Sequence, residues 1–121
     1  MKANKTRFSP SPTGLLHLGN LRTALFSFLM AQKHKSPFLL RIEDTDFERS
    51  KEEFSKAICE DLNWMQLNWD EGPHSGGKED SYYRSERVHL YEEFYSELSD
   101  KNLIYPCFTA KKNSRLFEEI K

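Results

Sequence analysis

Residues 7–20 constrain what this chain can fold into more than any other stretch. They read Arg-Phe-Ser-Pro-Ser-Pro-Thr-Gly-Leu-Leu-His-Leu-Gly-Asn. Proline cannot donate to a sheet ladder, so a strand predicted over residues 6–9 must stop at Pro10, and turn residues follow as far as Gly14. Backbone N–H groups at the start of the next helix are unpaired, and the helix dipole favours an anion there. The stretch therefore predicts a phosphate-binding corner between a strand and a helix.

The apolar residues after this corner predict a βαβ unit. A helix is predicted over residues 20–35 because its apolar residues have helical spacing. They are Leu21, Ala24, Leu25, Phe28 and Leu29. Ser36-Pro37 ends the helix, and the continuous apolar run over residues 38–42 predicts a strand of the kind that parallel sheets bury on both faces. The predicted fold class is therefore α/β, with a parallel sheet flanked by helices.

Two further helices and a loop are predicted before residue 103. Ser50 and Glu53 have the spacing of a capping box and predict the start of a helix. Its apolar face carries Phe54, Ala57, Ile58, Leu62 and Met65. The polar, glycine-rich residues 70–83 predict a loop with a function or with mobility. The other predicted elements are a helix over residues 88–102, a strand over residues 104–108, and a last helix that begins at Asn113 or Ser114.

Composition excludes several classes of protein. A chain of 121 residues, of which 37% are hydrophobic and 13% aromatic, is one domain or a fragment of one and has enough apolar side chains for a core. No apolar run approaches the roughly 18 residues of a membrane span, and no signal peptide opens the chain. Two unpatterned cysteines, Cys59 and Cys107, fit a reducing compartment. We therefore expect a cytoplasmic protein without a membrane partner.

Charge is distributed unevenly along the chain. The formal net charge is −1, but residues 1–42 hold seven Lys or Arg and no Asp or Glu. Residues 43–121 hold eleven Lys or Arg and nineteen Asp or Glu. A basic first third around the predicted corner favours an anionic ligand, although chance clustering on a solvated surface would give the same pattern.

Several motifs, met in the same order along the chain, resemble the glutamyl-tRNA synthetases, a branch of the class I aminoacyl-tRNA synthetases. The likeness covers residues 7–14, 17–20, 21–25, 41–46, 70–73, 83–87 and 105–107. It implies a Rossmann-type catalytic domain with this chain as its N-terminal part. Residues 1–103 would be the first part of that domain, and residues 104–121 the start of the acceptor-binding insertion.

The resemblance implies an ATP site at Thr13, Gly14, His17, Gly19 and Asn20. His17 and Gly19 match a nucleotide-binding motif that reads His-x-Gly-His in many relatives. His17 would donate to the phosphates as negative charge moves in the transition state, and Gly19 would leave room for the adenine. Asn20 replaces the second histidine and can still donate, so His17 and Asn20 are the implied catalytic residues. The alternative is a turn histidine followed by Asn20 as a helix N-cap.

The resemblance also implies a glutamate site at Arg7, Ser9, Ser11 and Glu43. The planar guanidinium of Arg7 matches the side-chain carboxylate of glutamate, and Glu43 would pair with the substrate's ammonium. Ser9 and Ser11 could add hydrogen bonds to the amino acid. The alternative is a structural ion pair between Arg7 and Glu43 across adjacent strand ends.

Two further expectations concern the tRNA and metals. Asp46 and Arg49 lie where the family approaches the 3′ end of the tRNA, and the alternative for both is an ordinary loop charge or helix-start acid. Some relatives hold zinc with a pattern that starts Cys-x-Cys. This chain has Cys107-Phe108-Thr109 with no later Cys or His, so a metal site is not expected, since structural zinc takes about four ligands.

The implied reaction is ATP-dependent attachment of L-glutamate to tRNA(Glu) through glutamyl-adenylate, with Mg²⁺ accompanying the ATP and a monomeric full-length enzyme. Relatives carry a later Lys-Met-Ser-Lys-Ser-like loop, and residues 111–114 have the wrong spacing for it. The chain is therefore expected to be inactive alone. The alternatives are a paralogue that glutamylates a queuosine-modified tRNA(Asp), a nucleotidyltransferase, and a non-catalytic interaction module.

Overall fold

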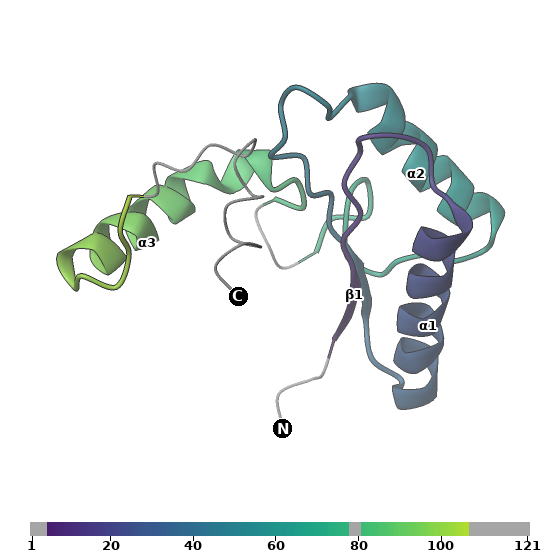
Figure 1. The fold of residues 1–121 in the computed structure, drawn as a ribbon. Helices are drawn as coiled ribbons and strands as arrows, with labels where there is room; N and C mark the ends of the chain where they lie inside the picture. The colour runs from purple at the N-terminus through teal and green to yellow at the C-terminus, as the bar shows by residue number, and fades with distance from the viewer. Residues whose placement is uncertain (1–4, 78–80, 107–121) are drawn as a thin grey trace, which may run out of the picture. The chain divides into compact units, whose positions relative to one another are not determined.

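A computed structural model of the chain describes residues 5–77 and 81–106 (Figure 1). The chain divides into two units, Met1–Val88 and His89–Lys121. The elements in order are β1 (Thr6–Phe8), α1 (Leu18–His34), β2 (Phe38–Leu40), α2 (Glu52–Trp64), a 3₁₀ turn η1 (Ser85–Arg87) and α3 (Val88–Asp100). No helix among the described residues is both long enough and apolar enough to cross a membrane.

The predicted βαβ unit is confirmed. β1 and β2 pair in parallel, with Arg7 opposite Leu39 and Phe8 opposite Leu40. α1 connects the two strands and packs against both, and Figure 1 shows it running alongside β1. Phe28 of α1 meets Phe38 of β2 edge to face, with ring centroids 5.7 Å apart. This packing fixes the end of β1 beside the start of α1, where the phosphate-binding corner is predicted.

α1 carries apolar residues on two faces, and helical spacing alone could not predict which of the two faces is buried. Ala24 and Ala31 are buried, and Leu21 and Phe28 pack against the core. Leu25 and Leu29, which have the same helical spacing, are 40% and 52% exposed. The face that meets the strands therefore combines two alanines, which let the helix approach the sheet closely, with Leu21 and Phe28, which pack beside them.

α2 begins later than the capping-box prediction places it. The helix starts at Glu52 after Lys51, which makes no side-chain cap hydrogen bond. The backbone N–H of Ser50 instead donates to the carbonyl of Asp46, at 2.8 Å, and the Ser50 hydroxyl has no hydrogen-bond partner among the described residues. The prediction of Ser50 as the cap is wrong because a turn over residues 46–50 already uses its backbone. The buried residues of the helix are Ser55, Ile58, Cys59 and Leu62.

The predicted loop over residues 70–83 is fastened to the sheet at both ends. Leu40 N–H donates to the carbonyl of Glu71 at 2.9 Å, and Ile42 N–H donates to that of Tyr82 at 2.9 Å. The Trp69 indole N–H donates to the carbonyl of Pro73, also at 2.9 Å. Residues 71 and 82 therefore both bind the carboxyl end of β2, and these two hydrogen bonds hold the strand end in place.

The last predictions have mixed outcomes. The helix predicted over residues 88–102 is confirmed as α3. Residues 104–106 have no regular structure, so no strand begins there. The rest of that predicted strand, the last helix and Cys107 lie outside the described residues. The domain boundary after residue 103 stays a prediction.

Candidate functional site

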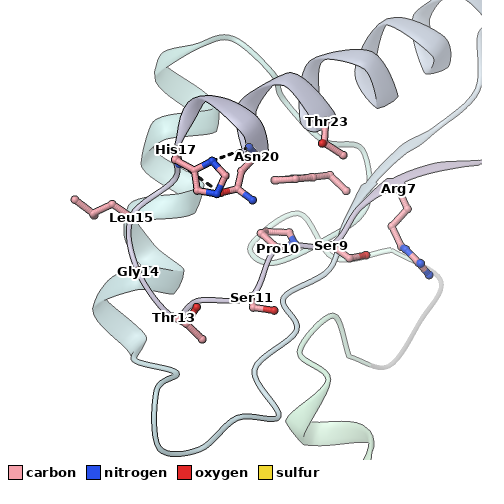
Figure 2. Close-up of a pocket in the computed structure, with 11 residues that line it drawn as sticks. Arg7, Ser9, Pro10, Ser11, Thr13, Gly14, Leu15, His17, Asn20 and Thr23 are labelled. Atoms are coloured by element: carbon pink, nitrogen blue, oxygen red, sulfur yellow. Dashed lines mark hydrogen bonds between the residues drawn. The ribbon is translucent and has the colours of Figure 1, made fainter. Parts of the chain in front are cut away.

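A cavity of about 620 Å³ opens where β1 ends and α1 begins (Figure 2). Seven of the predicted site residues line it, namely Arg7, Ser9, Ser11, Thr13, Gly14, His17 and Asn20. The other lining residues are Phe8, Pro10, Leu15 and Thr23. Gly19, Glu43, Asp46 and Arg49 are not among them. Figure 2 shows Arg7 and His17 at opposite ends of the lining, so the cavity has two chemically different ends.

His17 is the N-cap of α1, and this corrects the alternative that gave the cap to Asn20. The backbone N–H groups of Gly19 and Asn20 donate to His17 Nδ1, at 3.1 and 3.4 Å. The side-chain oxygen of Asn20 accepts in return from the His17 backbone N–H at 3.4 Å, which completes a capping box. Because Nδ1 accepts these bonds, the proton of the neutral ring lies on Nε2. The corner thus retains an imidazole N–H donor.

Gly19 contributes to this corner by leaving space for the His17 ring. A Cβ built at Gly19 would lie 2.9 Å from Cε1 and 3.0 Å from Nδ1 of His17. Any larger residue would push the ring away from the helix start that it caps. The Gly19 backbone therefore supports the imidazole directly, whereas the cavity wall is made by its neighbours.

The other end of the cavity presents an uncompensated cation. The Arg7 side chain is exposed and forms no ion pair with any described residue. Beside it, the Ser9 hydroxyl oxygen is buried and has no hydrogen-bond partner in the described part of the chain. A buried hydroxyl without a partner is costly, and most such groups are satisfied by a ligand or water. This end of the cavity therefore suits an anion that also accepts or donates hydrogen bonds.

Glu43 lies next to the cavity, since its backbone N–H donates to the carbonyl of Pro10 at 2.9 Å. Its carboxylate does not pair with Arg7. Arg41 Nε donates to Oε1 at 2.8 Å, Arg41 Nη2 lies 2.7 Å from the same oxygen in an ion pair, and Arg84 Nη1 donates to Oε2 at 2.7 Å. The alternative of a structural Arg7–Glu43 pair is therefore wrong, which leaves Arg7 available to a ligand.

Asp46 and Arg49 contact each other in the turn before α2. Arg49 donates from Nε to the Asp46 carboxylate at 2.7 Å and from its backbone N–H at 3.2 Å. The hydrogen bond that Arg49 donates to Asp46, and then the charge of Asp46, raise the pKa of Arg49 above its ordinary value. Both side chains lie outside the cavity lining, and any role toward tRNA stays a prediction.

Sequence reasoning missed the partners that hold the acidic end of β2. Arg41, Arg84 and Ser85 all contact Glu43 or Asp44. Arg41 could have been found, because it lies two residues before Glu43 and so shares its side of the chain. The contact with Arg84 spans 41 residues and has no local signal. Within residues 5–77 and 81–106, no group of three or more His, Cys, Asp or Glu side chains could hold a metal ion.

Comparison with known proteins shows the family of this chain. The sequence profile of the family described as "tRNA synthetases class I (E and Q), catalytic domain" matches residues 4–119. The chain belongs to this family. The predicted resemblance to the glutamyl branch is confirmed by curated relatives. A glutamate–tRNA ligase of Coxiella burnetii is 49% identical over 116 residues, and one of Nitrosococcus oceani is 52% identical over 110 residues.

Solved structures confirm the Rossmann-type fold that the family implies. A glutamate tRNA ligase from Elizabethkingia meningosepticum, in complex with its amino acid, is 40% identical and has a TM-score of 0.78 over 82% of this chain. The corresponding enzyme of Elizabethkingia anophelis is 42% identical, with a TM-score of 0.76 over 79% of this chain. The matches cover 96% of the chain but 25% of the Coxiella enzyme, and 91% but 23% of the Nitrosococcus enzyme. The matches to the two solved structures cover 20% and 19% of the solved chains. This chain thus spans about a quarter of its curated relatives.

Proposed function

We propose that the cavity belongs to a glutamate–tRNA ligase that joins L-glutamate to tRNA(Glu) in the cytoplasm. The α-carboxylate of glutamate attacks the α-phosphorus of ATP, and pyrophosphate leaves as glutamyl-adenylate forms. A terminal ribose hydroxyl of the tRNA then takes the glutamyl group and AMP leaves. No side chain acts as a covalent nucleophile in this scheme. The residues of the chain bind and orient the reactants and stabilise the moving charge.

The unpaired Arg7 guanidinium is the observation that carries this proposal. It lies in the same cavity as the start of α1, where the helix dipole favours an anion and His17 presents its remaining ring N–H. A cation that pairs with no described residue, beside the Ser9 hydroxyl that also lacks a described partner, suits the side-chain carboxylate of glutamate. Glu43, next to the cavity, would accept from the substrate's ammonium. The site thus offers opposite charges to opposite ends of one dicarboxylic amino acid.

ATP would occupy the other end of the cavity. The Nε2–H of His17 can donate to a phosphate oxygen, and Asn20, Thr13 and Gly14 border the same space. Mg²⁺ fits as a companion of the ATP phosphates, because it is usually bound through substrate phosphates and few carboxylates. Its chemistry when bound is to neutralise charge on those phosphates.

Among the described residues, only one pair is proposed to contact the tRNA. Asp46 and Arg49 form an exposed pair in the turn before α2, and the proposal assigns this pair to the acceptor end. A synthetase for queuosine-modified tRNA(Asp) would use the same amino-acid cavity. Charging assays with purified tRNA(Glu) and tRNA(Asp) separate the two, and we expect tRNA(Glu) to be charged.

His17 is predicted to have two separable roles. His17→Ala should lower the free energy of unfolding by about 1 kcal/mol, because two N–H groups at the start of α1 lose their acceptor. His17→Asn should keep near-normal stability, since asparagine is a good N-cap, but should weaken ATP binding about fivefold through loss of the ring N–H donor. Urea denaturation and ATP calorimetry measure the two effects. Unchanged ATP affinity in His17→Asn would reduce the imidazole to a helix cap.

Pyrophosphate exchange tests the function itself. The 121-residue chain should bind L-glutamate and ATP in calorimetry but show no glutamate-dependent exchange, because it contains no Lys-Met-Ser-Lys-Ser-like motif. A chimaera in which residues 4–119 replace the matching quarter of the Coxiella enzyme should exchange with L-glutamate and not with L-aspartate. Exchange by the isolated chain at the rate of that enzyme would contradict the dependence on the longer protein. Exchange with a different amino acid would contradict the assignment of glutamate.

A further inference from the structure

Residues 82–85, here called the support segment, run parallel to the chain just beyond β2. Ile42 N–H donates to the carbonyl of Tyr82, and Arg84 N–H donates to the carbonyl of Ile42, at 2.9 and 3.0 Å. Ile42 and Tyr83 form the corresponding parallel bridge. The support segment therefore extends the sheet at the point where the acidic residues 43 and 44 begin.

Side chains of the support segment bind both of these acidic residues. Arg84 Nη1 donates to Glu43 Oε2 at 2.7 Å. Ser85 donates to both oxygens of Asp44, from its backbone N–H at 2.8 Å and from its hydroxyl at 2.6 Å. One short segment thus fixes two successive carboxylates through backbone and side-chain bonds together.

Among the described residues, the contacts to Glu43 leave a position on Oε2 for a ligand. A carboxylate offers about four acceptor positions, two on each oxygen. Arg41 occupies Oε1, with a hydrogen bond from Nε at 2.8 Å and an ion-pair contact from Nη2 at 2.7 Å, and Arg84 fills one position on Oε2. The Glu43 side chain is 13% exposed, so its rotamer is restrained by these partners and not by solvent. The remaining position on Oε2 can accept one N–H.

We infer that Arg84 is a positioning residue of the amino-acid site, which holds the Glu43 carboxylate so that the free acceptor position meets the substrate's ammonium. The inference rests on the proposed function, because it takes Glu43 as the ammonium acceptor. Ser85 supports the same arrangement by fixing the adjacent Asp44. Arg84 acts through Glu43 and does not itself contact the substrate.

An electrostatic role and a positioning role of Arg84 predict opposite changes in glutamate affinity. Removing the Arg84 cation would draw an ammonium more strongly to Glu43, so a purely electrostatic role predicts tighter glutamate binding in Arg84→Met. A positioning role predicts weaker binding, because Glu43 loses the partner that fixes Oε2. The Arg84 side chain is 44% exposed, so solvent screens its charge and the loss of position should dominate.

The experiment is calorimetric titration of the 121-residue chain with L-glutamate and, separately, with ATP. Arg84→Met should weaken glutamate binding by about five- to tenfold, the loss expected for a hydrogen bond to a charged group at a half-exposed site. Arg84→Lys, which keeps the charge, should restore part of this affinity. Ser85→Ala should weaken glutamate binding about twofold. ATP affinity should be unchanged in all three variants.

The matched control is Arg87→Met, which removes the same charge from the same turn at a side chain that forms no ion pair with a described residue. It should bind glutamate normally. In a Glu43→Gln background, Arg84→Met should add little further loss. Unchanged or tighter glutamate binding in Arg84→Met, or an equal loss of ATP binding, would overturn the inference. Absence of glutamate binding by the unchanged chain would instead overturn the proposed function.

Discussion

Replacement of Arg7 by methionine is expected to weaken L-glutamate binding by roughly 100-fold, the largest effect of any single change in the cavity. A charge-assisted hydrogen bond contributes about 1.5–3 kcal/mol, and the guanidinium can offer two to one carboxylate. Arg7 makes no ion pair with a described residue, so its removal leaves no protein carboxylate unpaired. The loss should therefore appear in ligand affinity and leave the stability of the fold unchanged.

Calorimetry with L-glutamate, L-glutamine and ATP tests whether Arg7 recognises the side-chain carboxylate. Arg7→Met should bind L-glutamine about as well as L-glutamate, because the charge that distinguishes them has lost its partner. ATP affinity should change little, since His17 lies at the far end of the cavity lining (Figure 2). Arg7→Lys should fall between, because an ammonium keeps the charge without the planar fork.

Arg22→Met is the matched control. It removes an exposed cation from α1 that lies over the Phe26 ring, 5.7 Å from its centroid, and outside the cavity. Its glutamate affinity should equal that of the unchanged chain. If Arg7→Met and Arg22→Met bound glutamate equally well, the cavity would not recognise the side-chain carboxylate.

The fold of the first forty residues could be predicted because each signal is local. Pro10 stops β1, Pro37 follows the end of α1, and the apolar run between residues 38 and 42 needs cover on both faces. A strand end and a helix start that are joined by a tight turn must lie together, so local signals also predict where the corner lies. The roles of the seven residues that line the cavity were implied by the family resemblance and stay a prediction.

The helix N-caps and the partners from distant parts of the chain could not be predicted from local sequence signals. Ser50 has the preferred residue type for an N-cap, yet a turn from Asp46 uses its backbone and Lys51 takes the position. His17 is not a preferred cap, but Gly19 leaves its ring the space to fold over the helix start. Arg84 reaches Glu43 only because residues 82–85 add to the sheet, and no spacing within the sequence encodes that.

A large effect on stability is expected at Gly72, where the chain first returns to β2. Gly72 has a φ of +155° and is buried. A Cβ there would lie 2.8 Å from the backbone oxygen of Leu40 and 2.7 Å from Cδ1 of Trp69. Gly72→Ala should therefore lower the free energy of unfolding by about 3 kcal/mol, as backbone strain and overpacking combine.

Gly76 provides the comparison that separates strain from overpacking. It also has positive φ, +67°, but a Cβ there would meet nothing within 4 Å. Gly76→Ala should cost about 1 kcal/mol, the strain alone. Equal losses for the two variants in urea denaturation would mean that β2 yields to the added methyl group. Because Leu40 N–H also donates to Glu71, a β2 that yielded in this way would move the strand end that precedes Glu43, and glutamate affinity would fall with it.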